Sequence, residues 1–297
     1  HTTRNFRNRE GSKPGEGQLA MVALMDARSI AATARNGGVL TGADQIDYAP
    51  PAGHEPPMDL GVYEKRVYCG WGAAKPEEPL VFGPNITDWP KFDPLPENLL
   101  LSVASVLTDP VTTTDELIPS GETSSYRSNP VRLSDFALSR RDPGYVGRAK
   151  AVRDAARESW AHLVPDPAKT GYATVIWAVR PGDGSAREQA ASCQRVLGGR
   201  ANICLEYATK RYRSNLVNWG ILPFTTDEAP CDVGDHLLIE NIRAAVERGD
   251  AQVTATRLSD GRKIPLRLDG LDITQRRILL EGCLMNYYAS TLKERER

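Results

Sequence analysis

The segment 172–179 constrains the fold of this chain more than any other. Its residues, Tyr-Ala-Thr-Val-Ile-Trp-Ala-Val, form an almost continuous apolar run, which is typical of a strand buried on both faces of a sheet. A glycine-rich turn follows the run, and we expect a helix from about 186 to 197 after that turn. A buried strand, a turn and a helix in this order predict an α/β domain.

The whole region 98–297 continues this alternation of strands and helices. We expect strands at 99–106 and 201–205, helices at 145–163 and 207–218, a hairpin of 253–258 with 263–268 around Asp260-Gly261, and a final helix that begins at a Thr274 cap and runs past Tyr288. The Asp-Gly pair is a hairpin signature because glycine readily adopts the positive φ that such turns require. The elements together predict a mixed sheet flanked by helices.

Two other zones precede this region. In residues 1–42 a polar opening leads to a helix that we expect to begin at an Asp26 cap and to end at Gly37-Gly38. Residues 43–97 hold ten of the chain's 21 prolines, and proline at that density excludes long helices and central strands. We therefore predict a crossover linker at 43–97 that joins two bodies.

Charge and cysteine content exclude several classes of partner. The formal net charge is −1, from 37 basic and 38 acidic residues, so no overall field favours nucleic acid or an anionic membrane. No apolar run approaches the ~20 residues that span a bilayer. The five cysteines include no C-x-x-C pair, so we expect reduced thiols, no metal site within the chain, and a cytoplasmic or mitochondrial-matrix location.

The turn after the buried strand carries the most informative polar residues. It reads Pro-Gly-Asp-Gly-Ser-Ala-Arg from 181 to 187, which places Ser185 and Arg187 at the start of the next helix. A helix N-terminus presents unpaired N–H groups and partial positive charge, which attract carboxylates and phosphates. Arg187 can bind a carboxylate through two parallel hydrogen bonds. On its own, however, this local pattern favours an ordinary capping serine beside a surface arginine.

A longer stretch around the turn resembles the C-terminal swivelling domain of the aconitase superfamily. In that family a G-x-G-S-S-R-E turn precedes a G-x-R-A-I strand and then R-x-x-x-x-N-L-x-x-x-G-x-L-P. The corresponding segments of this chain are Gly-Asp-Gly-Ser-Ala-Arg-Glu at 182–188, Gly-Gly-Arg-Ala-Asn-Ile at 198–203, and Tyr-Arg-Ser-Asn-Leu-Val-Asn-Trp-Gly-Ile-Leu-Pro-Phe at 212–224. Their shared order spans over forty residues, which makes chance a poor explanation.

Two other stretches match the family in the same order along the chain. Residues 113–121, Thr-Thr-Asp-Glu-Leu-Ile-Pro-Ser-Gly, resemble the T-T-D-H-I-S-x-A-G segment that begins the swivelling domain. Residues 3–9, Thr-Arg-Asn-Phe-Arg-Asn-Arg, resemble the N-R-N-F-x-x-R segment that closes the catalytic body. The resemblance therefore implies that 98–297 form an aconitase-type swivelling lid domain, that 43–97 cross over to it, and that 1–42 form the C-terminal edge of the catalytic α/β body.

The same resemblance implies roles for individual residues. Ser185 matches the base that removes a carbon-bound proton, and Asp115 matches an active-site acid. The positions that match substrate-binding residues of the family are Thr3, Arg4, Arg9, Arg127, Ala186 and Arg187. Thr3 stands where the family has an asparagine, and Ala186 where many members have a second serine. These two departures leave the identity of the substrate open.

In the family, a [4Fe–4S] cluster supplies a Lewis-acidic iron that assists departure of hydroxide. Three cysteines hold the cluster, two of them in a C-x-x-C ahead of the N-R-N-F segment, and none of the five cysteines here matches a ligand. We therefore expect residues outside this chain to bind the cluster. They would belong to a catalytic body supplied by missing N-terminal sequence or by a separate polypeptide.

The function implied is that of an aconitate hydratase-like hydro-lyase, which dehydrates and rehydrates a hydroxy-di- or tricarboxylate such as citrate or isocitrate. A related hydroxy acid, of the isopropylmalate or methylcitrate type, is the alternative substrate. A noncatalytic RNA-binding or regulatory relative is the alternative from another class, suggested by the basic cluster at 210–213. The sequence offers no aromatic platform beside that cluster, so we expect a solvated helix face there and not a nucleic-acid site.

Overall fold

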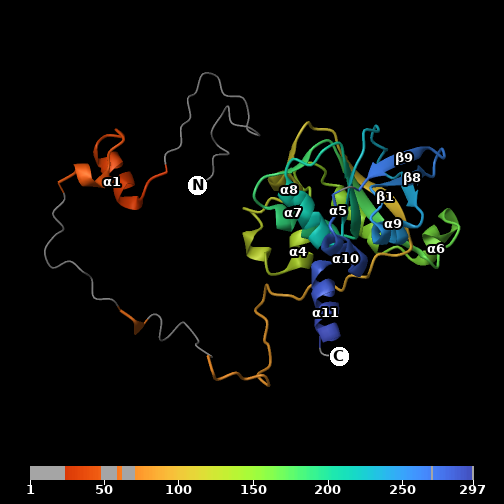
Figure 1. The fold of residues 1–297 in the computed structure, drawn as a ribbon, viewed down its shortest axis with the longest axis horizontal. Coiled ribbons are helices and arrows are strands. Elements are labelled where there is room, and N and C mark those ends of the chain that lie inside the picture. The colour runs from red at the N-terminus through yellow and green to blue at the C-terminus, as the bar shows by residue number, and fades with distance from the viewer. Residues whose placement is uncertain (1–23, 48–58, 62–70, 269, 296–297) are drawn as a thin grey trace. The chain divides into compact units, whose positions relative to one another are not determined.

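The protein is described by a computed structural model for residues 24–47, 59–61, 71–268 and 270–295. The chain divides into two compact units, 1–81 and 82–297 (Figure 1). The division falls inside the predicted crossover of 43–97. The assignment of 1–42 to a catalytic body and of 98–297 to a lid stays a prediction. None of the helices in the described ranges is long and apolar enough to cross a bilayer.

The described part of the first unit includes helix α1 (Ala27–Arg35). The Asp26 carboxylate accepts hydrogen bonds from the backbone N–H groups of Arg28, at 2.9 Å, and Ser29, at 3.2 Å, so the predicted N-cap is confirmed. The helix ends just before Gly37 and Gly38, whose φ angles are +64° and +89°. A 3-10 turn, η1 (Ala43–Gln45), follows.

Seven strands of the second unit close into a barrel. They are β1 (Asn98–Leu107), β3 (Thr170–Ala178), β5 (Gly199–Cys204), β6 (Leu222–Thr225), β7 (His236–Ile239), β8 (Gln252–Arg257) and β9 (Lys263–Arg267). Their order around the barrel is β1-β3-β5-β6-β9-β8-β7. The first four run parallel, and β7, β8 and β9 pair antiparallel with their neighbours. The predicted mixed sheet and the β8–β9 hairpin are confirmed. The closure of the sheet into a barrel was not predicted from the sequence.

Two hydrophobic cores explain why β3 is apolar on both faces. Val175 and Trp177 point into the barrel, where they join Phe224 and other strand residues. Ile176 and Ala178 point outward, into a second core built with residues of the covering helices. Alternate side chains of one strand thus enter different cores, as the continuous apolar run predicts.

The outer core is covered by α3 (Thr114–Leu117), α4 (Pro130–Ser134), α5 (Tyr145–Arg153), α7 (Arg187–Val196) and α8 (Lys210–Asn218) (Figure 1). The expected helix at 145–163 is wrong as a continuous element, because α5 stops at Arg153 and is followed by α6 (Arg157–Trp160) and the 3-10 turn η3 (Ala161–Leu163). Trp160 packs with Leu100 of β1 and Leu238 of β7. A continuation of α5 past Arg153 would not bring the Trp160 indole to this position, so the chain turns before α6.

The final helix also differs from its prediction. It begins at an Asp272 cap, two residues before the expected Thr274, and consists of α10 (Ile273–Glu281) and α11 (Leu284–Arg295). Gly282 separates the two at a φ of +92°, and a Cβ there would lie 2.1 Å from the carbonyl oxygen of Asp93. The segment before β1 passes so close to the helix at this point that only glycine fits, and the helix is interrupted there. The inner core is closed on this side by α10 and by α9 (Ile242–Arg248), which contribute Leu279, Ile242 and Val246.

Candidate functional site

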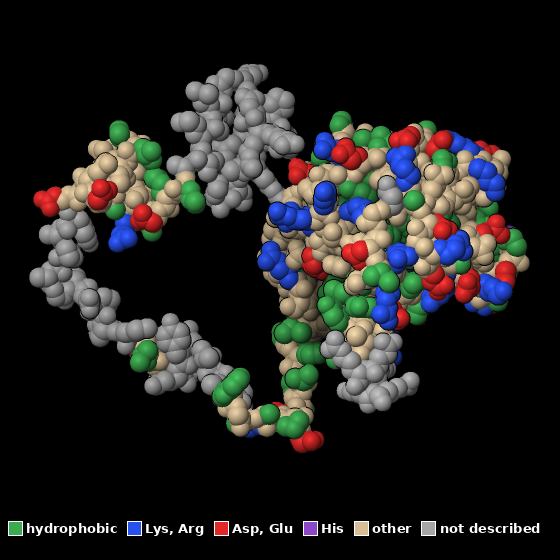
Figure 2. All heavy atoms as spheres, in the orientation of Figure 1, with side chains coloured by type: hydrophobic (Ala, Val, Ile, Leu, Met, Phe, Trp, Pro, Cys, Tyr) green, Lys and Arg blue, Asp and Glu red, His purple; other side chains and the backbone are tan. Residues whose placement is uncertain are grey.

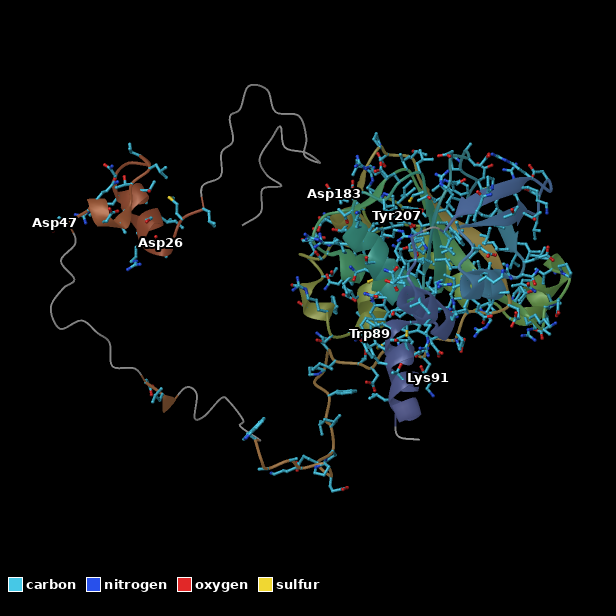
Figure 3. The ribbon with its side chains drawn as sticks, in the orientation of Figure 1. Asp26, Asp47, Trp89, Lys91, Asp183 and Tyr207 are labelled. Carbon is cyan, nitrogen blue, oxygen red and sulfur yellow. The ribbon has the colours of Figure 1, made fainter. Side chains whose placement is uncertain are left out.

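The turn after β3 is fixed by a second, two-stranded sheet. Its strands are β2 (Thr112–Thr113) and β4 (Pro181–Asp183), which run parallel with Thr112 opposite Pro181 and Thr113 opposite Asp183. Asp183 lies at the edge of the second unit (Figure 3). The pairing brings two of the family-like segments, 113–121 and 182–188, side by side although about seventy residues separate them.

Two glycines allow the backbone path of this turn. Gly182 has a φ of +100° and Gly184 a φ of +136°, values that side chains disfavour. A Cβ on Gly182 would lie 2.2 Å from Cδ1 of Tyr212, whose ring is fully buried. Thr209 donates a hydrogen bond to the Gly182 carbonyl at 3.2 Å. The turn therefore packs directly against the start of α8.

Ser185 is exposed and stands immediately before Ala186, the N-cap of the ten-residue helix α7. The Ala186 side chain makes no cap, but its N–H donates to Oγ1 of the buried Thr114 at 3.3 Å. This hydrogen bond joins the start of α7 to the start of α3. The Ser185 hydroxyl is thus presented at the positive end of a helix whose position is held by a neighbouring element.

Arg187, the first residue of α7, is half-buried. Its Nη1 donates to the carbonyl oxygen of Gly184, so the guanidinium folds back over the turn. The positive charge is therefore held beside the peptide that precedes Ser185. A positive charge and a helix N-terminus therefore both lie next to Ser185.

Asp115 lies in the first turn of α3, next to the Thr114 that contacts the turn. One of its carboxylate oxygens pairs with Nη1 of Arg140 at 3.0 Å. Arg140 also pairs with Glu122, and its pKa is raised, first by the hydrogen bond to Glu122 and also by Asp115. A capping box formed by Thr113 and Glu116 fixes the start of α3.

Arg127 is exposed and follows the 3-10 turn η2 (Ser124–Tyr126). Its Nη2 donates a hydrogen bond to the Ser120 carbonyl at 3.5 Å, within the loop between α3 and α4. Thr3, Arg4 and Arg9 lie outside the described residues. The structure thus brings together Asp115, Ser185, Ala186 and Arg187, and it places Arg127 on the adjoining loop without a described bond to the turn.

Sequence reasoning missed two residues of this site. Thr114 reads as one of several threonines in 112–114, and Arg140 as one of two adjacent arginines. Their roles depend on contacts with residues 72 and 25 positions away, which no local pattern encodes. The Thr113–Glu116 capping box, by contrast, follows a spacing that could have marked the start of α3.

The four described cysteines do not fit an iron–sulfur cluster. Cys193, Cys204, Cys231 and Cys283 are all buried, and burial raises the pKa of Cys193 and raises that of Cys204 to about 12, whereas cluster ligands are thiolates. No group of three or more possible metal ligands occurs among the described residues. We therefore derive no step through a metal centre from these side chains.

Comparison with known proteins agrees with this geometry. Residues 142–229, which include β3, the Ser185 turn, α7 and β5, match the family model for the aconitase C-terminal domain. This chain therefore contains an aconitase C-terminal domain over that segment. The predicted membership of a hydro-lyase family is thereby confirmed, as is the aconitase-type α/β class of the domain.

Two other comparisons complete the account. No curated protein sequence matches the chain. Among solved structures, the chain is similar to 3-isopropylmalate dehydratase (leuD) from Methanocaldococcus jannaschii, at 20% sequence identity and a TM-score of 0.47, over 67% of this chain and 98% of that one.

Proposed function

We propose that this member of the aconitase superfamily supplies the lid domain of a hydro-lyase that acts on a hydroxy-di- or tricarboxylate, with Ser185 as the base. One observation carries the proposal: an exposed serine stands at the N-terminus of α7, and the start of that helix is hydrogen-bonded to the segment that holds Asp115. Such a site needs a group that takes a proton and groups that hold carboxylates, and these residues can provide both.

Removal of a proton from carbon beside a carboxylate is difficult for a serine, whose hydroxyl is far too weakly acidic to be ionised in water. An alkoxide needs N–H dipoles and a nearby cation to stabilise it. The α7 N-terminus supplies the dipoles, and the Arg187 guanidinium, folded over the turn, supplies the charge. In the forward direction Ser185 takes the proton, and in the reverse direction it returns the proton to carbon.

Substrate carboxylates need cationic partners of fixed geometry. We propose that Arg127 and Arg187 bind them, together with Arg4 and Arg9 from the edge of the catalytic body. Arginine suits this task because its planar fork matches a carboxylate in two hydrogen bonds. Ala186 stands where many relatives have a serine, so this chain has one fewer hydroxyl with which to bind the substrate.

The remaining chemistry belongs to other residues. We propose that a catalytic body, in the same polypeptide or in a separate chain, binds the [4Fe–4S] cluster that assists departure of hydroxide. The lid would close over that body and gate substrate entry. A reducing compartment, the cytoplasm or the mitochondrial matrix, suits both such a cluster and the free thiols of the four described cysteines.

The test uses the enzyme assembled with its catalytic body, assayed in parallel with citrate, isocitrate and 3-isopropylmalate. Ser185→Ala should lower kcat by about 10²–10⁴-fold with little change in KM, as expected for loss of a general base. The matched control is Ser214→Ala on α8, because Ser214 is also exposed and donates to the Lys210 carbonyl at 3.0 Å. Retention of most activity by the Ser185 variant contradicts the assignment of the base. The preferred substrate of the wild type decides between the citrate and isopropylmalate alternatives.

A further inference from the structure

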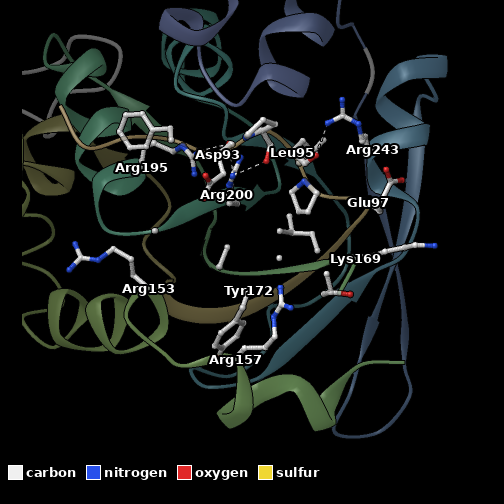
Figure 4. A pocket seen from close by; sticks show the side chains of 18 of the residues that line it. Asp93, Leu95, Glu97, Arg153, Arg157, Lys169, Tyr172, Arg195, Arg200 and Arg243 are labelled. Atoms are coloured by element: carbon white, nitrogen blue, oxygen red, sulfur yellow. Dashed lines mark hydrogen bonds between the residues drawn. The ribbon is translucent and has the colours of Figure 1, made fainter. Parts of the chain in front are cut away.

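The second unit contains a cleft of about 730 Å³ at the opposite end of the sheet from Ser185. Ser185 follows the carboxyl end of β3, whereas Thr170 and Gly171 at the amino end of β3 line the cleft, as does Arg200 near the amino end of β5. Segment 90–97 and α5–α6 form other parts of its wall (Figure 4). The cleft is thus separate from the site of the proposed reaction.

The lining of this cleft is strongly basic. It includes seven basic and two acidic residues, namely Lys91, Arg153, Arg157, Lys169, Arg195, Arg200 and Arg243 against Asp93 and Glu97. The chain as a whole carries a net charge of −1, and basic and acidic side chains are interspersed over much of the face in Figure 2. The concentration of positive charge in the cleft is therefore a local feature.

Arg195 and Arg200 form the deepest part of the cleft and are only 5% and 8% exposed. Their side chains donate hydrogen bonds to backbone carbonyl groups: Arg195 donates to Asp93 and Gly282 at 3.3 Å, and Arg200 donates to Asp93 at 2.7 Å and Pro94 at 3.1 Å. Within the described ranges, neither arginine forms an ion pair, and Nε of Arg195 and Nη1 of Arg200 have no hydrogen-bond partner. Two neighbouring buried guanidiniums thus have carbonyl hydrogen-bond partners, and each retains one donor without a partner among the described residues.

This arrangement is costly because two buried guanidiniums share one nearby carboxylate, that of Asp93. Arginine keeps its charge at neutral pH, and a buried charge is stable only when it is paired or hydrogen-bonded on all sides. Burial lowers the pKa of both groups, the charge of Arg200 lowers the pKa of Arg195 further, and the carboxylate of Asp93 opposes the shift in both. Carbonyl contacts explain how the pair positions segment 90–97 and the α10–α11 corner. These carbonyl contacts and the single carboxylate of Asp93 leave the arginine pair with a net positive charge.

The rim of the cleft offers further cations within reach. Arg157 is exposed, forms no ion pair among the described residues, and extends into the cleft from the side opposite Arg195 and Arg200 (Figure 4). Lys169 lies on the rim, where it is exposed, makes one long contact, 3.8 Å, with Asp166 and points outward in Figure 4. Positive groups therefore face the interior of the cleft from two sides, which suits a ligand with several negative charges.

We propose that this cleft binds a small polyanion, a phosphorylated or polycarboxylated metabolite, whose charge faces Arg195 and Arg200 on one side and Arg157 on the other, with Lys169 adding positive charge at the rim. Its occupancy would neutralise the buried pair and stabilise the contact of segment 90–97 with the α10–α11 corner. The site is independent of the proposed base and of the hydro-lyase reaction.

The experiment is calorimetric titration of the complete chain with sodium pyrophosphate and, separately, with citrate. At least one of the two should bind in a one-to-one ratio with a Kd below about 1 mM near physiological salt, and should raise the melting temperature. The stronger ligand identifies the phosphate or the carboxylate class. Arg127→Lys, which should weaken carboxylate binding at the Ser185 site, should bind at the cleft as tightly as wild type, so failure of the proposed function and failure of this site are distinguishable.

The rim residues provide variants that do not disturb the buried pair. The double variant Arg157→Glu/Lys169→Glu should weaken binding at least tenfold, and the matched double variant Arg248→Glu/Lys263→Glu, which alters one exposed arginine and one exposed lysine outside the cleft, should bind within threefold of wild type. Absence of binding by both anions, equal binding by the rim variant, or equal loss in both variants overturns the proposal.

Discussion

Replacement of Gly182 by alanine tests how rigidly the turn before Ser185 is held. The added Cβ would lie 2.2, 2.4 and 2.6 Å from Cδ1, Cγ and Cβ of Tyr212, well inside van der Waals contact. Tyr212 cannot easily move, because its ring is fully buried and its hydroxyl accepts a hydrogen bond from Gln194 at 2.8 Å. Either the turn or the start of α8 must therefore shift.

Two costs combine in this variant. Overpacking of a rigid site costs about 1–3 kcal/mol, and a non-glycine residue at a φ of +100° costs a further ~1–2 kcal/mol. We expect the free energy of unfolding to fall by about 2–5 kcal/mol. For a unit of this size each 1 kcal/mol lowers the melting temperature by about 2–4 °C.

Gly261→Ala is the matched control. Gly261 also has a positive φ, +72°, but nothing lies within 4 Å of the Cβ that would be added, so only the backbone cost of about 1 kcal/mol applies. Urea denaturation of wild type and both variants measures the difference. Equal loss of stability in the two variants would refute the close packing of the turn on Tyr212. In the assembled enzyme, Gly182→Ala should also lower kcat, because a displacement of about 1 Å at a reacting group can cost a hundredfold.

Three other changes test the remaining parts of the account. Arg127→Lys and Arg187→Lys should each raise KM about tenfold or more in steady-state assays, since an ammonium cannot form the bidentate pair, and an unchanged KM in both would remove these residues from the carboxylate site. Arg140→Gln should lower kcat about ten- to a hundredfold by releasing Asp115 from its ion pair, with partial recovery in Arg140→Lys; full activity in both would show that this pair has no positioning role. Burial lowers the pKa of His236 below its ordinary 6.5, so the unfolded state binds more protons and the stability of the chain should decrease as pH falls below about 6.5, a dependence that urea denaturation should find reduced in His236→Gln.

Local features of the fold could be predicted from the sequence. The strand at 170–178 and the turn and helix after it follow from an apolar run and a glycine cluster, both of which act over a few residues. The Asp26 cap of α1 is equally local, since the carboxylate bonds N–H groups two and three positions along the chain. In each case short-range sterics and hydrogen bonding determine the outcome.

Features that depend on distant contacts could not be predicted. The break after α5 serves the packing of Trp160 against β1 and β7, and the break at Gly282 serves close approach to Asp93. The same reason applies to the candidate site, where the turn and helix start that carry Ser185 were predicted from sequence, but the hydrogen bond of Ala186 to Thr114 was not. The basic cleft is the extreme case, because its lining residues come from positions 90 to 243 and share no sequence motif.

The most direct test of the account follows the carbon-bound hydrogen itself. Wild-type and Ser185→Ala enzymes, each assembled with the catalytic body, are incubated with substrate in deuterium oxide, and exchange at the carbon beside the carboxylate is followed by proton NMR. Rapid deuterium incorporation in the wild type, reduced at least a hundredfold in the variant with substrate affinity unchanged, is the predicted result. Exchange at the wild-type rate in the Ser185 variant would contradict the central claim.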